Sequence, residues 1–235
     1  MLELDEEQTA AQMQTAIQGS TYYITKIHRS LTAGIWNTFC SPQRLGINAI
    51  RAELKSETPY EMTGYNTTDK TITFSASDHI DPNKPYLIMP SEDVSEITIF
   101  NSTPAAYDPQ TVTSNGLSFV AALGATNIYT TGDASSTKFF LNKSGKLVYP
   151  TSNEGNKGMI KGFRAYFEIP SGGLVKDMTV IFEDEDDPTG VIRVEQDIFN
   201  ETGRIYSVDG RYVSDSKENL SRGIYIQNGR KFIVK

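Results

Sequence analysis

Cysteine and histidine are scarce in this chain, which has one cysteine, Cys40, and two histidines, His28 and His79. A single cysteine excludes an internal disulfide, which a secreted eukaryotic domain would usually have but a bacterial exported protein does not need. Three such side chains, scattered along the sequence, cannot complete a structural zinc site without carboxylates, and neither HExxH nor CxxC is present. Phosphate-binding glycine loops are missing as well. The sequence therefore predicts no metal ion and no cofactor.

Clustered basic residues and long apolar runs are also absent. The net charge is −7 and the pI is near 5.0, which argues against nucleic acid and anionic lipid as partners, since both require clustered Lys and Arg. No apolar run approaches the length of about 18 residues that a membrane-spanning helix needs, so the sequence predicts no transmembrane segment. The start "MLELDEEQTA" lacks the apolar core of a signal peptide. The chain therefore either stays in the cytosol or begins after a removed leader.

Catalytic motifs are lacking too. Nucleophilic catalysis needs a serine or cysteine beside a base, and the sequence has no Gly-x-Ser-x-Gly elbow. A pair of Cys40 and a histidine, oriented by Asp81, is one candidate; a buried apolar thiol is the other reading of Cys40, which is close to Trp36 and Phe39. Paired carboxylates for glycoside hydrolysis stay open, because 29 acidic residues offer many pairs. The sequence favours a protein that is not an enzyme and assigns no catalytic residue.

What the chain does contain is many short segments in which apolar and polar residues alternate. Residues 71–76, 118–123 and 163–169 show this period of two, with Phe163, Ala165 and Phe167 on one face of the last segment. Residues 138–142 and 146–150 flank Ser144-Gly145, which predicts a hairpin. Turn-forming clusters of Gly, Pro, Asn and Asp separate these runs. The pattern predicts an all-β fold with a sandwich-like main domain.

Three segments are less regular. Residues 1–20 place Ala10, Met13 and Ile17 at helical spacing, which indicates a linker or a short N-terminal helix. Residues 42–54 form a second candidate helix, in which Leu45, Ile47, Ile50 and Leu54 share a face. Residues 21–30 are predicted to form a strand with Tyr22, Ile24 and Ile27 on its apolar side, with one break in the alternation.

The run "EDEDDPTG" at residues 183–190 opens with five consecutive acidic residues, which repel one another and do not pack. One interpretation is a solvated hinge, and the other is a calcium loop at 183–187, since calcium prefers carboxylate oxygens. Calcium loops usually space their ligands with intervening residues, so the hinge is favoured. We therefore predict a linker or helix at 1–20, the main domain at 21–183, a hinge at 184–190 and a C-terminal module at 191–235.

The C-terminal module contains the same phrase twice, "IYSVDGRYV" at 205–213 and "IYIQNGRKF" at 224–232. Asp-Gly and Asn-Gly between β-prone runs are strong signals for two-residue hairpin turns, because these residues tolerate positive φ. The sequence predicts two successive hairpins, a meander of about four strands in which Tyr206 and Tyr225 are equivalent. Turn chemistry also explains "DGR" and "NGR", which otherwise match adhesion tripeptides.

The ending "RIYSVDGRYV…LSRGIYIQNGRKFIVK" resembles the C-terminal segment of exported proteins of Bacteroides and Prevotella, and more loosely the C-terminal sorting domains of that phylum. Upstream, "AGIWNTFCSP" is similar to the Trp-Asn-Thr-Leu-Cys-Leu-Pro-Phe signature of the same surface proteins. "NKPYLIMP" and "GFRAYFEIPSG" resemble their Gly-Lys-Pro-Tyr-Leu-Val and Phe-Arg-Ala-Tyr-Phe stretches. The order and spacing agree over roughly residues 20–235. Two positions depart from this pattern: Ser41-Pro42-Gln43 stands in place of Leu-Pro-Phe, and Asn83 precedes Lys84 in place of Gly.

The resemblance implies a non-catalytic, exported β-protein at the cell surface or in the periplasm, which acts in adhesion or ligand presentation. Its implied partners are a protein or glycan at the cell surface, together with an envelope or export partner for the C-terminal module. The alternative is a carbohydrate-binding or carbohydrate-processing accessory protein, because aromatic side chains on β surfaces stack on sugar rings.

Aromatic residues are the candidates for such stacking, but most tyrosines in strands are half-buried, with the hydroxyl in water. Trp36, the only tryptophan, opens an apolar strand and is expected in the core. Arg164 and Tyr166 share a strand face, so they form a cation–π pair or a structural surface pair. The ligand-binding residues stay unassigned. The tyrosines considered are Tyr22, Tyr23, Tyr60, Tyr65, Tyr86, Tyr107, Tyr129, Tyr149 and Tyr166.

Overall fold

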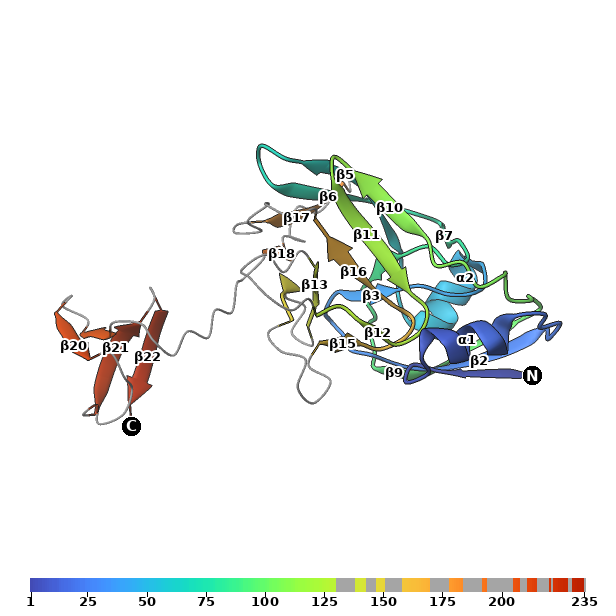
Figure 1. Ribbon diagram of the computed structural model, residues 1–235, viewed down its shortest axis with the longest axis horizontal. Coiled ribbons are helices and arrows are strands. Elements are labelled where there is room, and N and C mark those ends of the chain that lie inside the picture. The colour runs from blue at the N-terminus through green and yellow to red at the C-terminus, as the bar shows by residue number, and fades with distance from the viewer. Residues whose placement is uncertain are drawn as a thin grey trace. The chain divides into compact units, whose positions relative to one another are not determined.

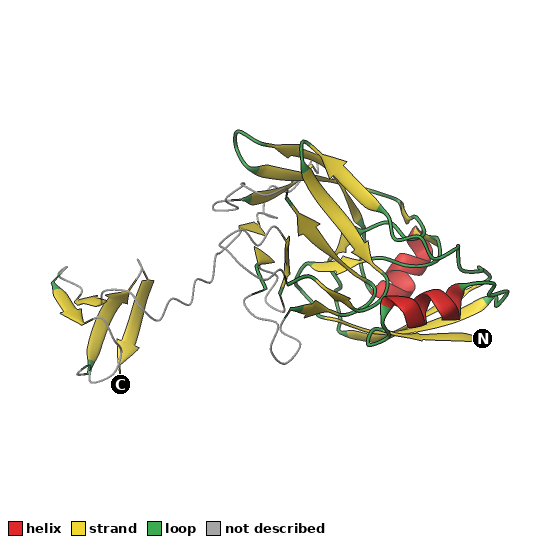
Figure 2. Cartoon of the chain, viewed as in Figure 1, coloured by secondary structure: helices red, strands yellow, loops and turns green. Residues whose placement is uncertain are grey.

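The computed structural model of the chain is mostly β, as the sequence predicts (Figures 1 and 2). Contacts divide the chain into two units, residues 1–196 and residues 197–235. In the part of the chain that the structure describes, no helix is long and apolar enough to cross a membrane. The structure describes residues 1–129, 138–142, 147–150, 158–169, 178–183, 192–193, 205–207, 211–214, 220, 222–227 and 230–234.

The described residues of the first unit form three larger sheets and two short strand pairs. The three-stranded sheet, β1-β2-β9, consists of Leu2–Asp5, Ile24–Leu31 and Val94–Phe100. The six-stranded sheet, β18-β17-β6-β5-β8-β3, consists in that order of Ile192–Arg193, Thr179–Glu183, Thr71–Ala76, Tyr60–Asn66, Tyr86–Ile88 and Asn37–Phe39. The five-stranded sheet, β10-β11-β16-β13-β14, consists of Thr111–Ser114, Leu117–Ala122, Arg164–Glu168, Lys138–Leu141 and Leu147–Val148. The pairs are β4 with β7, at Leu45–Gly46 and His79–Ile80, and β12 with β15, at Thr126–Asn127 and Met159–Ile160.

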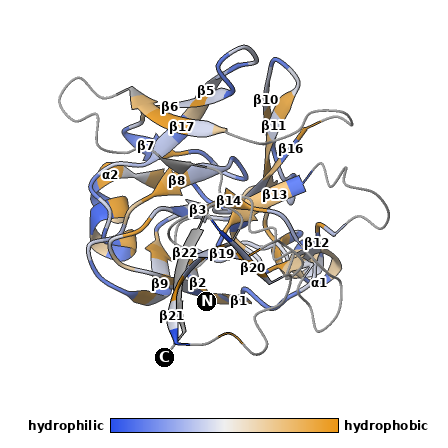
Figure 3. Ribbon diagram, turned by 90° about the vertical axis from the view of Figure 1, so that its left-hand side faces the viewer, coloured by the Kyte–Doolittle hydropathy of each residue, from blue (hydrophilic) through white to orange (hydrophobic). Residues whose placement is uncertain are grey.

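The six-stranded and five-stranded sheets pack face to face through buried aromatic rings. Phe74 of β6 meets Phe119 of β11 edge-on, with ring centroids 5.5 Å apart, and Phe119 stacks on Phe167 of β16 at 4.5 Å. Figure 3 shows apolar stretches on β6 and β11. Each aromatic side chain contributes a large buried area, so these rings supply much of the burial that holds the two sheets together. This arrangement is the sandwich that the alternating segments predict.

The segments with strict alternation adopt the predicted strands. In β16, Ala165 and Phe167 are buried and Arg164 and Glu168 are half-buried, as predicted; Tyr166, expected on the polar face, is buried too, and Phe163 lies in a bend before the strand. Strands β13 and β14 pair antiparallel in the register Leu141 to Leu147, which confirms the predicted pairing. The turn between them lies outside the described residues.

Residues 1–20 belong to the core of the first unit, so they do not form a linker. Helix α1 spans Ala10–Ile17 and buries Met13 and Ile17, as the helical spacing indicates. Strand β1, which the sequence did not reveal, pairs in parallel with β2 and buries Leu4. Thr9 caps α1: its hydroxyl accepts from Gln12 N–H, and the Gln12 side chain accepts from Thr9 N–H.

The other two irregular segments differ in part from the prediction. Helical structure is confined to α2, Ile47–Ala49, and the π-helix η1, Ile50–Leu54, and does not begin at residue 42. Leu45 instead pairs with Ile80 in a short bridge. In β2 the buried face is Thr25, Ile27, Arg29 and Leu31, while Tyr22 and Ile24 are exposed.

The second unit, described by itself, is a four-stranded sheet of order β20-β19-β21-β22. Its strands in that order are Tyr212–Ser214, Ile205–Ser207, Gly223–Gln227 and Arg230–Val234. The two hairpins are present, but they are joined through β19 and β21, so the sheet is not a sequential meander. Tyr206 is half-buried and Tyr225 is buried, so the two tyrosines are not equivalent.

Several predicted features lie outside the described residues: the hinge and most of the acidic run at 184–190, Asp209-Gly210 and Asn228-Gly229. The strand β18 falls within the range predicted for the C-terminal module, yet it pairs with β17 of the first unit. The contact boundary accordingly follows residue 196.

Candidate functional site

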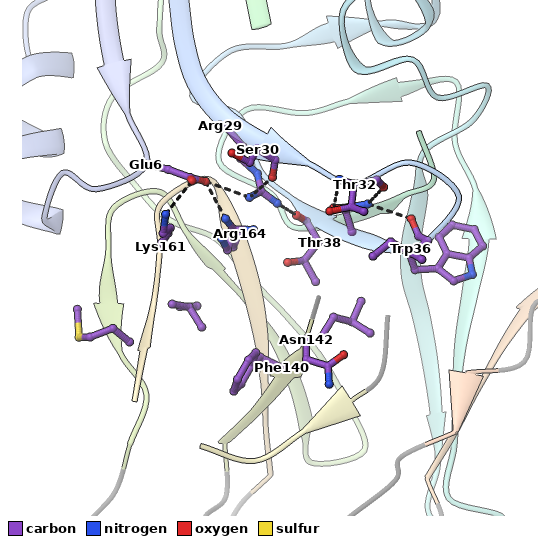
Figure 4. Close-up of a pocket in the computed structure, with 15 residues that line it drawn as sticks. Glu6, Arg29, Ser30, Thr32, Trp36, Thr38, Phe140, Asn142, Lys161 and Arg164 are labelled. Carbon is purple, nitrogen blue, oxygen red and sulfur yellow. Dashed lines mark hydrogen bonds and ion pairs between the residues drawn. The ribbon is translucent and has the colours of Figure 1, made fainter. Parts of the chain in front are cut away.

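A cavity of about 470 Å³ lies within the first unit, a volume in the range of small-molecule sites. Figure 4 shows four charged side chains, Glu6, Arg29, Lys161 and Arg164, gathered on one side and Trp36 on another. Strands β2, β3, β13, β15 and β16 contribute to its walls. The remaining lining residues are Ser30, Thr32, Ile35, Asn37, Thr38, Phe140, Leu141, Asn142, Met159 and Ile160.

Glu6 is the centre of the charged cluster. Its side chain is 9% exposed, and its two oxygens accept from three cations. Lys161 Nζ lies 3.1 Å from Oε1, while Arg164 Nη2 lies 2.7 Å and Arg29 Nη1 3.5 Å from Oε2. A buried carboxylate is tolerated only when it is paired and hydrogen-bonded, and Glu6 meets that condition.

Arg29 is the most deeply buried member, with a side chain that is fully inaccessible to solvent. Its Nη2 donates to the carbonyl of Thr38 at 2.6 Å and its Nη1 donates to the carbonyl of Ser30 at 3.4 Å. Among the described residues, its Nε has no hydrogen-bond partner. Since an unsatisfied N–H of a buried charged group is costly, Arg29 is the least well compensated part of the cluster.

Lys161 and Arg164 reach the same carboxylate because the chain turns between them. In a regular strand, residues three apart point to opposite faces. Phe163 breaks that rule with a φ of 55°, a left-handed conformation that is rare for a bulky residue. Its N–H donates to the carbonyl of Leu123, and its carbonyl accepts from the N–H of Cys40. Neighbouring backbone therefore holds the bend that brings the two cations together.

The backbone of Glu6 is fixed from two sides. Its N–H donates to the carbonyl of His28 at 3.0 Å, and its carbonyl accepts from the N–H of Gly162 at 2.7 Å. A Cβ at Gly162 would lie 2.6 Å from the carbonyl oxygen of Leu123, and a Cβ at Gly124 would lie 2.6 Å from the backbone of Ala10. These contacts require glycine at both positions, so the N-terminal segment packs closely enough to place Glu6 in the cavity.

Trp36 is half-buried and packs against the core of the sandwich, in keeping with the core position that we expected. Its ring stacks on Phe182 at 4.1 Å with an interplanar angle of 11° and meets Tyr60 edge-on at 5.2 Å. The loop before it is tied by Asn37, whose side-chain amide donates to the carbonyls of Thr32 and Ile35. This loop holds the only tryptophan of the chain against the cavity.

The electrostatics of the cluster follow from its burial. Burial lowers the pKa of Arg29 well below its ordinary value, and the charge of Arg164 adds to that effect while Glu6 opposes it. Burial also lowers the pKa of Arg164, against the pull of Glu6. Hydrogen bonding to Glu7, and then to Glu6, raises the pKa of the more exposed Lys161. Both guanidinium groups therefore lie where burial disfavours their charged form and Glu6 supports it.

Cys40 is the buried apolar thiol that its neighbours in sequence indicate. Its Sγ donates to the carbonyl of Arg164 at 3.2 Å, and burial raises the pKa of the thiol to about 12. His79 faces Asp78 and Asp81 through its two ring nitrogens, and His28 lies beside Glu96. Since a thiol with this pKa is not a nucleophile near neutral pH, the arrangement does not support a Cys40–histidine–Asp81 site.

The tyrosines are mostly half-buried, as predicted. Of the nine tyrosines considered, Tyr22 and Tyr23 are exposed, at 50% and 68%, while Tyr86 and Tyr166 are buried. Arg164 does not pair with Tyr166: it binds Glu6, and Lys138 lies over the ring of Tyr166. The half-buried ones are Tyr60, Tyr65, Tyr107, Tyr129 and Tyr149.

Comparison of the chain with protein-family models, with curated proteins and with solved structures finds no match. Among the described residues, no group of three or more His, Cys, Asp or Glu side chains could hold a metal ion. The site therefore has to be interpreted from its own residues.

The sequence analysis missed Glu6, Arg29 and Lys161. One signal was present: Arg29 follows Ile27 and precedes Leu31 at steps of two, so an arginine shares a strand face with two apolar residues. A charge at such a position indicates a buried partner. The partner itself, Glu6, lies in a segment without a strong pattern, and pairing between distant segments brings it there.

Proposed function

We propose that this protein is a non-catalytic binding protein of the bacterial cell envelope that holds a ligand for adhesion or presentation. The observation that carries the proposal is the cavity of about 470 Å³, which combines two aromatic side chains, amide and hydroxyl groups and a charged cluster. A concave site with a few convergent polar groups is the usual form of a ligand pocket. The likeness of the sequence to exported surface proteins supports the location at the envelope.

A second candidate is carbohydrate recognition, favoured by the presence of Trp36 and Phe140 beside Asn37 and Asn142 in one lining. Aromatic faces stack on sugars, and amides bond to their hydroxyls. One observation weighs against the strongest form of this idea. The parallel rings of Trp36 and Phe182 cover each other at 4.1 Å, so they do not form a pair of open, coplanar platforms.

Trp36 provides the experiment, because it is the only tryptophan and it lines the cavity. A glycan array, run with and without calcium, would supply ligands, and each binder would then be titrated while tryptophan fluorescence is recorded. We expect a saturable change in emission at the concentration that saturates binding.

Array binding that leaves the emission of Trp36 unchanged and survives Thr32→Trp, which fills the cavity, would place recognition elsewhere. The exposed Tyr23→Trp is the matched control for the added ring. The proposed binding function would be overturned if no glycan on the array binds and no protein in a panel of envelope proteins binds in the same fluorescence titration.

A further inference from the structure

Positive charge in the cavity stands out against the rest of the molecule. The chain has a net charge of −7, yet the cavity is lined by three cationic side chains, Arg29, Lys161 and Arg164, and by one carboxylate, Glu6. Glu7 binds Lys161 at 2.5 Å but does not line the cavity. Among the described residues, three cations therefore share two carboxylates, Glu6 and Glu7, so the cluster keeps one positive charge in excess.

Arg29 gives an independent sign of a missing acceptor. It is 1% exposed, and its Nε is without a hydrogen-bond partner in the described part of the chain. Its contact with Glu6 is long, at 3.5 Å, whereas Arg164 lies 2.7 Å from the same oxygen. Buried polar groups in native proteins are almost always satisfied, so Glu6 does not fully compensate the charge of Arg29 behind the cavity wall.

The geometry of the donors suits an oxyanion. Arginine has five N–H donors and lysine has three, more than the bonds to Glu6 employ. Guanidinium groups match the oxygens of carboxylate and sulfate, and they do so best where water is excluded. All three cations converge on the carboxylate of Glu6, because each of them lies beside one of its two oxygens.

We propose that the cavity binds a small ligand through an oxyanion, a carboxylate or a sulfate, held by the accessible cations Lys161 and Arg164 beside Glu6, with the buried charge of Arg29 behind them. The inference rests on the proposed function, because it concerns the ligand class of the same cavity. Trp36 lies against the remainder of that ligand, away from the charged cluster (Figure 4).

The test is a fluorescence titration of the full chain with glucuronate, inorganic sulfate and glucose, at constant ionic strength set by sodium chloride. We expect saturable binding of glucuronate or sulfate and at least tenfold weaker binding of glucose, because charge-assisted bonds are the strong ones. Glucuronate alone identifies a carboxylate ligand, and sulfate alone identifies a sulfated one.

Lys161→Gln is the main variant, because its side chain is 47% exposed and the change carries little risk for folding. We expect oxyanion affinity to fall about tenfold. Lys26→Gln is the matched control, because Lys26 also pairs with a glutamate, Glu96, but does not line the cavity. The oxyanion affinity of this variant should equal that of the wild type.

Glu6→Gln gives a result of opposite sign. Removal of the competing carboxylate should tighten oxyanion binding, and sulfate or glucuronate should raise the melting temperature of this variant more than that of the wild type. General salting-out by sulfate would instead raise the melting temperatures of the wild type, Glu6→Gln and Lys161→Gln by the same amount.

Equal binding of glucose and glucuronate would overturn the oxyanion assignment and leave the proposed binding function standing. The oxyanion assignment would also be overturned if no compound binds in the titration and the melting temperatures of all variants shift equally. The cluster would then be purely structural. Failure of the proposed function has a separate signature, which is the absence of any binder on the array.

Discussion

Strands β16 and β2 each bury a face in the first unit, but the two faces differ in chemistry. On β16 the face with Ala165 and Phe167 packs into a sandwich of aromatic rings. On β2 the buried face is Thr25, Ile27, Arg29 and Leu31, so one position in the middle of the strand is a charge. The first face is held by apolar burial and the second depends on a partner from another segment.

This difference teaches where pattern reading succeeds. An apolar face is stabilised by burial against almost any apolar surface, so the period of two is enough to identify it. A buried arginine is stable only beside a carboxylate and carbonyl oxygens, here Glu6 and Thr38. No local period encodes those partners.

The largest expected effect is on the apolar side of the comparison. Phe167 stacks on Phe119 at 4.5 Å and on Phe139 at 5.0 Å, so Phe167→Ala leaves a cavity between the two sheets. We expect a loss of about 4 kcal/mol in the free energy of unfolding. Urea unfolding followed by the fluorescence of Trp36 would measure it in the first unit. Phe100→Ala, at a residue that is 58% exposed, is the control and should be nearly neutral; equal losses would refute the assignment of the core.

Glu6→Gln tests the charged side. It leaves Arg29 buried without a carboxylate, which should cost about 3 kcal/mol of unfolding free energy in the same urea experiment. Glu7→Gln is the matched change at a neighbour that binds Lys161 but has a side chain 67% exposed, and it should cost far less. Equal costs at the two positions would mean that the cluster contributes no more than a surface ion pair.

Gly124→Ala tests how the N-terminal segment is held beside β2. The new Cβ would lie 2.6 Å from the backbone of Ala10, so helix α1 and the segment before it must shift. We expect a loss of about 2 kcal/mol, measured by thermal or urea unfolding. Gly46→Ala, where nothing lies within 4 Å of the added Cβ, is the control. A neutral Gly124→Ala would show that the close approach is not needed.

Arg29→Met tests the other member of the buried Glu6–Arg29 pair. Glu6 keeps Lys161 and Arg164, so it is not left unpaired, and the methionine fills much of the buried space. We expect a loss of only about 1 kcal/mol, smaller than that of Glu6→Gln. A larger loss of unfolding free energy in Arg29→Met than in Glu6→Gln would show that stability depends more on the Arg29 side chain than on the carboxylate.

Lys26→Gln has the smallest expected effect. Lys26 lies on the outer face of β2 and pairs with Glu96 at 2.9 Å in a solvent-exposed setting. Exposed ion pairs contribute little because water and salt screen them. We expect no measurable change in the unfolding midpoint, and a clear loss would show that this face of β2 is not simply solvated.

Most of the sheet structure could be predicted from the sequence, but little of the candidate site could. The aromatic face of β16, the pairing of β13 with β14, helix α1 and the inert character of Cys40 follow from local pattern and residue type. The strand order of the C-terminal unit was predicted incorrectly, because β19 pairs with β21 across a connection whose path no local signal specifies. Strand β1 is too short and too acidic to be recognised before its pairing with β2 is known.

The sequence by itself determined the β class, the apolar faces of the sandwich and the two C-terminal hairpins, because each depends on residues that are neighbours along the chain. Only the tertiary structure decided that Glu6, Arg29, Lys161 and Arg164 meet at one cavity and that Trp36 lines it. The physical reason is that a buried charge is stabilised by specific partners at short distance. Those partners come from β2, from the segment that follows β1 and from the bend at Phe163, which are far apart in sequence and adjacent only in the folded protein.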